Sequence, residues 1–181
     1  MERVAFTARR GTLHWPAAAA WLLLAWWTAR SGLAGQWIFL DFVNLAFHEA
    51  GHVFLRFAGS TVHYLGGTLF QILIPAILVA HFMLRAHQPL GAACCLWWAG
   101  QNLANIATYM ADARDLALPL VGGGDHDWNE LFHRFGALDA DSVALIAGLT
   151  RGAGVLLMLA GLVWIGRMVF FGAPSRRLDA E

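Results

Sequence analysis

Apolar residues in this chain are gathered into five long runs, and this pattern limits the folds that the chain can adopt. The runs cover residues 13–29, 33–58, 68–85, 90–110 and 143–171. A helix needs about 20 apolar residues to cross the roughly 30 Å of membrane hydrocarbon. The first run is short for that length, so the pattern predicts an all-α, polytopic transmembrane helical bundle of four to five spans.

The composition agrees with a lipid environment. Hydrophobic residues make up 59% of the chain and charged residues 13%, whereas a soluble domain carries about 25% charged residues. We therefore expect residues 1–181 to form a single membrane domain. The only extended hydrophilic stretch is 112–141, predicted to be a loop with a short amphipathic helix at 128–135, and the glycines within 59–67 predict a second loop.

The charge balance excludes one class of partner and indicates a source. The 12 basic and 12 acidic residues give a net charge of zero, so the chain lacks the basic footprint of a nucleic-acid-binding protein. All the basic residues are arginine, which is typical of a GC-rich bacterial genome. The expected location is the bacterial cytoplasmic (inner) membrane, with the lipid bilayer as the main partner of this multi-pass protein.

The second run contains the motif His48-Glu49-Ala50-Gly51-His52. On a helix, two residues four apart lie about 40° from each other on one face, so both imidazoles can bind one metal ion. Glu49 lies beside that face, where a carboxylate can take a proton from a metal-activated water. A charged side chain in a membrane helix costs about 2.5–3.5 kcal/mol on the insertion scale. Glu49 therefore needs a compensating partner, and zinc is the expected one.

Two polar stripes accompany the motif. On its own helix Asp41 and Asn44 share the face of His48, where either one orients an imidazole or forms an interhelical hydrogen bond. The fourth run carries a matching stripe, which consists of Gln101, Asn102, Asn105, Thr108, Tyr109 and Asp112. Polar stripes in lipid are expected to be buried against each other. The amides of Asn102 and Asn105 either pack helices or donate to an oxyanion.

A hydrolytic zinc site needs a third protein ligand and an open position for water. Asp112 ends the stripe of the fourth run and is the first candidate. His126, between Asp125 and Asp127 in a glycine-rich segment, is the second if that segment folds back over the metal. The alternative for His126 is a loop residue, with Asp125 or Asp127 capping the following helix.

The motif in its apolar setting resembles the site-2 protease class of intramembrane zinc metalloproteases, over about residues 40–115. This resemblance implies zinc as cofactor, Glu49 as the catalytic acid and base, and cleavage of a peptide bond in or near a transmembrane helix of a membrane-protein substrate. The chain departs from the family at 109–114, which lacks the family's proline and glycine around the aspartate. The segment Gly-Gly-Gly-Asp-His-Asp-Trp also resembles a loop shared by a group of small bacterial membrane proteins.

The sequence thus predicts a zinc-dependent intramembrane protease in which His48, His52, Asp112 and His126 are the metal-ligand candidates and Glu49 activates water. Two alternatives remain open. One is a membrane zinc hydrolase of lipid amides or esters, which would use the same activated water. The other is a membrane metal-binding or transport protein whose polar stripes hold an ion without chemistry.

Overall fold

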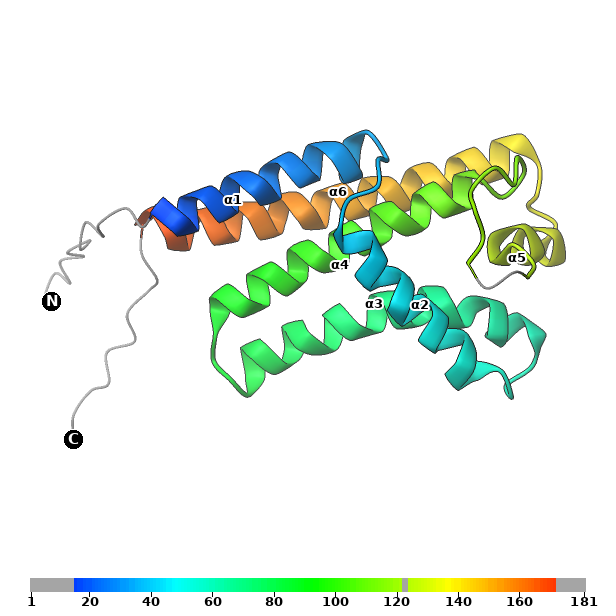
Figure 1. The fold of residues 1–181 in the computed structure, drawn as a ribbon, viewed down its shortest axis with the longest axis horizontal. Coiled ribbons are helices and arrows are strands. Elements are labelled where there is room, and N and C mark those ends of the chain that lie inside the picture. Colours follow the sequence, from blue (N-terminus) through cyan, green and yellow to red (C-terminus); the bar gives the residue numbers. More distant parts are fainter. Residues whose placement is uncertain (1–14, 122–123, 172–181) are drawn as a thin grey trace, which may run out of the picture.

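The computed structural model describes residues 15–121 and 124–171, and these residues form helices only. The helices are α1 (Trp15–Trp27), the π-helical turn η1 (Thr28–Leu33), α2 (Leu40–Leu55), α3 (Ser60–Leu84), α4 (Pro89–Ala111), α5 (Asp127–Phe135) and α6 (Ala140–Phe171). Figure 1 shows α1, α4 and α6 running side by side, with α3 on the other side of α4 and α2 crossing α3. The predicted all-α class is confirmed.

Fewer of the described helices are long and apolar enough to cross a membrane than the sequence predicts. Among the described helices, α3 and α6 are the two that are long and apolar enough to cross a membrane. α1 and α2 contain 13 and 16 residues, fewer than the roughly 20 that a span needs. α4 has 23 residues, but its polar stripe lowers its hydropathy. Four to five spans are therefore not confirmed, and residues 13 and 14 of the first run lie outside the described part.

The helix predicted at 33–58 begins later than expected, and the first residue of that run belongs to the preceding element. η1 ends at Leu33 and α2 begins at Leu40. Gly35 between them has a positive φ of 62°, and its Cα faces the guanidinium of Arg151 on α6. A side chain at residue 35 would meet both strain and the Arg151 nitrogens, so glycine permits this break.

The prediction of a loop at 59–67 is wrong, because α3 already begins at Ser60 and contains Gly66 and Gly67. These glycines serve close packing. A Cβ at Gly66 would lie 2.7 Å from the carbonyl oxygen of Gly51 on α2. Glycine thus lets the backbones of α2 and α3 approach each other at the level of the His48 motif.

A layer of buried polar groups fixes the start of α2. The Asp41 carboxylate accepts hydrogen bonds from the Ile38 amide at 2.7 Å and from Gln101 Nε2 of α4 at 2.6 Å. Asn44 donates to Gln101 Oε1 at 2.6 Å. The two polar stripes predicted from the sequence therefore meet inside the protein, as expected, and they join α2 to α4.

The predicted amphipathic helix is also present, as α5. Its apolar face buries Trp128, Leu131 and Phe132 against residues of α4 and α6 that include Ile106 and Val143. The helix ends at Gly136, which has a left-handed φ of 67°, a common helix terminator. This packing holds the first residue of α5, Asp127, over the motif on α2.

Candidate metal centre

The structure brings His48 and His52 of α2 together with Asp127 of α5. The Oδ2 atom of Asp127 lies 2.9 Å from Nε2 of His48 and 3.2 Å from Nε2 of His52. The two Nε2 atoms are 3.0 Å apart. Within the described residues these three are the group of histidine and acidic side chains suited to hold a metal ion.

The other nitrogen of each imidazole is fixed by a hydrogen-bond acceptor. Nδ1 of His48 donates to Gln71 Oε1 of α3 at 2.9 Å, and Nδ1 of His52 donates to the carbonyl oxygen of His63 at 2.8 Å. A neutral imidazole that donates from Nδ1 carries its lone pair on Nε2. Both lone pairs are therefore directed at the Asp127 carboxylate. Three acceptor atoms at such distances require a cation or shared protons between them.

The spacing of the three atoms suits a small metal ion. Zinc bonds of about 2.0–2.1 Å at tetrahedral angles place neighbouring ligand atoms about 3.3 Å apart. The observed separations of 2.9, 3.0 and 3.2 Å are slightly shorter. Two imidazoles and one carboxylate, with an open fourth position, form a ligand set found in hydrolytic zinc sites. The residues present thus fit zinc in number, type and spacing.

Glycines between the helices make room for this arrangement. A Cβ at Gly67 would overlap the ring of His48, and a Cβ at Gly51 would overlap the backbone of Gly66. The glycine inside the motif is therefore needed for the approach of α3, and α3 in turn supplies Gln71. Gln71 could have been noticed in the sequence, because it is an amide residue within the otherwise apolar run 68–85.

Asp127 is held at the start of α5 by its backbone as well as by its carboxylate. Its amide donates to the hydroxyl oxygen of Tyr109 on α4 at 3.1 Å. Burial alone would raise the pKa of Asp127, but the hydrogen bonds and charges of His48 and His52 outweigh burial and hold its pKa below the ordinary value. Asp127 is therefore an anion at neutral pH, as a metal ligand must be.

Asp112 and His126 lie in a separate pair. The Asp112 carboxylate accepts hydrogen bonds from the amides of Ala117 and Leu118, both at 3.0 Å. His126 caps α5, because its Nδ1 accepts the Asn129 amide at 3.2 Å, and its Nε2 faces Asp112 Oδ2 at 3.4 Å. Burial, opposed by Asp112, lowers the pKa of His126.

This placement differs from the predicted ligand set, because neither Asp112 nor His126 lies in the group that His48 and His52 form. His126 accepts the Asn129 amide at Nδ1, and its Nε2 is directed to Asp112. The Asp112 carboxylate is engaged by the backbone of its own loop. The third member of the group that could hold a metal ion is Asp127, which the sequence treated only as a helix cap, and the segment around His126 does fold back over the motif.

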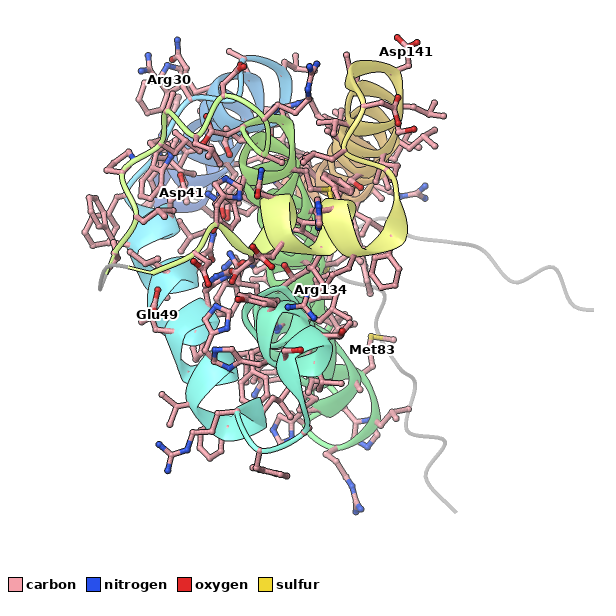
Figure 2. The ribbon with its side chains drawn as sticks, turned by 90° about the vertical axis from the view of Figure 1, so that its right-hand side faces the viewer. Arg30, Asp41, Glu49, Met83, Arg134 and Asp141 are labelled. Carbon is pink, nitrogen blue, oxygen red and sulfur yellow. The ribbon has the colours of Figure 1, made fainter. Side chains whose placement is uncertain are left out.

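A cavity of about 370 Å³ opens beside the cluster, and Glu49, His48, His52 and Asp127 all line it. Figure 2 shows the protein from the side on which α5 lies, with Asp41 and Glu49 of α2 labelled. The rest of the wall combines apolar residues from the segments before α2 and before α5 with polar groups of α3 and α4. The apolar residues of these two segments are Trp37, Leu118, Pro119, Leu120 and Val121, and α2 adds Leu45.

Asn44 of α2, which was a candidate to orient an imidazole of the motif, forms its hydrogen bonds with other groups. Asn44 hydrogen-bonds Asp41, Gln101 and Trp98 and forms no hydrogen bond with either histidine of the motif. Gln71, which holds His48, donates from its Nε2 to Asn105 Oδ1 at 3.1 Å. The His48 ring is therefore connected through Gln71 to Asn105 of α4.

Comparisons with protein-family models, curated proteins and solved structures found no match to this chain. Any statement of function therefore depends on the geometry and chemistry of the site.

Proposed function

We propose that this protein is a membrane-embedded, zinc-dependent hydrolase, and that it cleaves peptide bonds in or near transmembrane helices of other membrane proteins. The observation that carries the proposal is the convergence of His48 Nε2, His52 Nε2 and Asp127 Oδ2 within 2.9–3.2 Å of one another. Glu49 lines the cavity that opens from this cluster.

The chemistry assigns a role to each side chain. His48, His52 and Asp127 hold zinc, which would supply Lewis acidity and lower the pKa of a water molecule toward about 7. Glu49 accepts a proton from the attacking water as the water oxygen forms a bond to the substrate carbonyl carbon. Glu49 then returns that proton to the departing amide nitrogen as the C–N bond breaks.

The membrane location is supported by two features of the surface. α3 and α6 are long and apolar enough to span a bilayer. Large apolar side chains are exposed along the helices, and the most exposed on α2 and α6 include Phe42, Phe54, Leu156 and Phe171. Exposed apolar surface of this extent is typical of contact with lipid. The proposal includes a multi-pass arrangement in a bacterial inner membrane.

The decisive experiment compares the wild type with Glu49→Gln and Asp127→Asn, purified in detergent. Zinc per chain is measured by mass spectrometry, and hydrolysis is measured on a panel of single-span membrane peptides and a panel of lipid amides and esters. We expect Glu49→Gln to retain zinc and lose hydrolysis, and Asp127→Asn to lose both.

Each alternative outcome has a clear meaning. Turnover of lipids but of no peptide would select the lipid hydrolase. Full activity in Glu49→Gln would overturn both enzymatic functions and leave a metal-binding or transport protein. A wild type without bound metal would overturn the proposal as a whole.

A further inference from the structure

Tyr109 on α4 lies at the edge of the candidate metal centre, and its hydroxyl group accepts a hydrogen bond but donates none within the described residues. The hydroxyl oxygen accepts the amide hydrogen bond of Asp127 at 3.1 Å. Within residues 15–121 and 124–171, no acceptor for the hydroxyl proton is found. The side chain is half-buried and lines the cavity. Its O–H group can therefore donate to a molecule in the cavity.

The ring that carries this hydroxyl is held from two sides. The centroid of the Tyr109 ring lies 5.9 Å from that of His48, at an interplanar angle of 74°. On its other side the ring packs on His126, with centroids 4.1 Å apart. A donor fixed in this way needs little reorganisation when a substrate reacts, which is the property that makes such groups effective in catalysis.

The other hydroxyl groups in the cavity wall are committed elsewhere. Three hydroxyl-bearing residues line the cavity: Tyr64, Thr108 and Tyr109. Tyr64 donates to Asp125 Oδ2 at 2.8 Å, and Thr108 donates to the carbonyl oxygen of Ala104 at 3.1 Å. Among these three, Tyr109 alone has a proton available to a bound substrate within the described structure.

The two amides that the sequence suggested as oxyanion donors differ in their surroundings. Asn102 donates from Nδ2 to the Trp98 carbonyl oxygen at 3.1 Å. Asn105 accepts from Gln71 Nε2 through its Oδ1 at 3.1 Å, and it lines the cavity. Asn102 is outside the cavity lining, whereas the Asn105 Nδ2 group, which has no acceptor among the described residues, is a second candidate donor beside Tyr109.

We infer that Tyr109 is a catalytic residue, whose O–H donates to the substrate carbonyl oxygen as that atom gains negative charge during attack by water. This inference rests on the proposed hydrolytic function. It assigns the charge-stabilising role to a residue of α4 whose ring lies beside His48, in the cavity that the proton acceptor Glu49 of α2 also lines. Removal of one such donor lowers kcat by about 10²–10³-fold in other hydrolases.

Binding of methylphosphonate, a tetrahedral anion that resembles the charged intermediate, tests the inference without a known substrate. The zinc-loaded wild type, Tyr109→Phe and the matched control Tyr64→Phe are titrated calorimetrically, and zinc per chain is measured in parallel. We expect Tyr109→Phe to keep its zinc and to bind methylphosphonate at least about ten-fold more weakly, since a hydrogen bond to a charged group is lost. Tyr64→Phe should bind it like the wild type.

The other outcomes separate this inference from the proposed function. Equal affinity of the wild type and Tyr109→Phe, or no binding by a zinc-loaded wild type, would overturn the role of Tyr109 and leave the metal centre standing. Loss of zinc in Tyr109→Phe would also overturn it, because the hydroxyl would then only position Asp127. A wild type that binds no zinc would overturn both the metal centre and the role of Tyr109.

Discussion

The Cα of Gly67 on α3 lies against the imidazole of His48 on α2, so closely that a methyl group at residue 67 would overlap the ring. The position of the metal-ligand candidate therefore depends on the absence of a side chain on the neighbouring helix. This contact also places Gln71, one turn further along α3, within 2.9 Å of His48 Nδ1.

Gly67→Ala should displace His48 and weaken zinc binding by about 10- to 100-fold, as changes around metal ligands commonly do. Zinc affinity is measured by competition with a chelator on the purified protein. Gly148→Ala on α6 is the matched control, because nothing lies within 4 Å of a Cβ at that position. Equal affinities in the two variants would contradict the proposed role of the Gly67 contact.

Asp127→Asn and Asp112→Asn should have opposite effects on metal content. Asp127→Asn removes the anionic ligand, so we expect a loss of affinity larger than the roughly 10- to 100-fold of an outer-shell change. Asp112→Asn should retain zinc, because the Asp112 carboxylate binds the amides of Ala117 and Leu118. Zinc per chain after dialysis distinguishes them, and the reverse pattern would make Asp112 the third ligand.

The local part of the site could be predicted from the sequence because it depends on helix periodicity alone. His48 and His52 converge because residues four apart share one face of a helix. The stripes of α2 and α4 meet because polar groups avoid an apolar surrounding. The first interaction follows from residue spacing within one helix, and the second follows from the polar character of the facing sides of two helices.

The position of Asp127 beside His48 and His52 could not be predicted, because it depends on the path of a connecting segment. Asp112 directly follows α4 and Asp127 begins α5, and the sequence favours Asp112 because it continues the polar stripe of the fourth run. The amides of Ala117 and Leu118 turn back onto Asp112, while the buried face of α5 directs Asp127 to the histidines. Gly66 and Gly67 were misassigned to a loop for a related reason, since glycine marks turns and close helix contacts alike.

Gln71→Leu should weaken zinc binding while leaving the fold intact. Gln71 accepts the Nδ1 proton of His48 at 2.9 Å, and loss of such a partner typically lowers metal affinity by about 10- to 100-fold. Thr68→Val is the control on the same helix, because the buried Thr68 hydroxyl has no hydrogen-bond partner in the described part of the chain. Chelator competition on both variants provides the comparison, and unchanged affinity in Gln71→Leu would show that His48 needs no orienting acceptor.

Gly100→Ala should reduce stability without touching the metal centre. Gly100 on α4 packs on α6, where an added Cβ would lie 2.5 Å from the Gly154 carbonyl oxygen and 2.6 Å from the Met158 amide. Backbone atoms cannot turn away as side chains can, so the helices must separate, and overpacking of this kind costs about 1–3 kcal/mol. Gly152→Ala, whose Cβ meets nothing within 4 Å, is the control and should be neutral or slightly stabilising, since alanine favours helix. Thermal unfolding in detergent measures both variants. A Gly100→Ala midpoint equal to that of Gly152→Ala would mean that α4 and α6 are not in close contact in the purified protein.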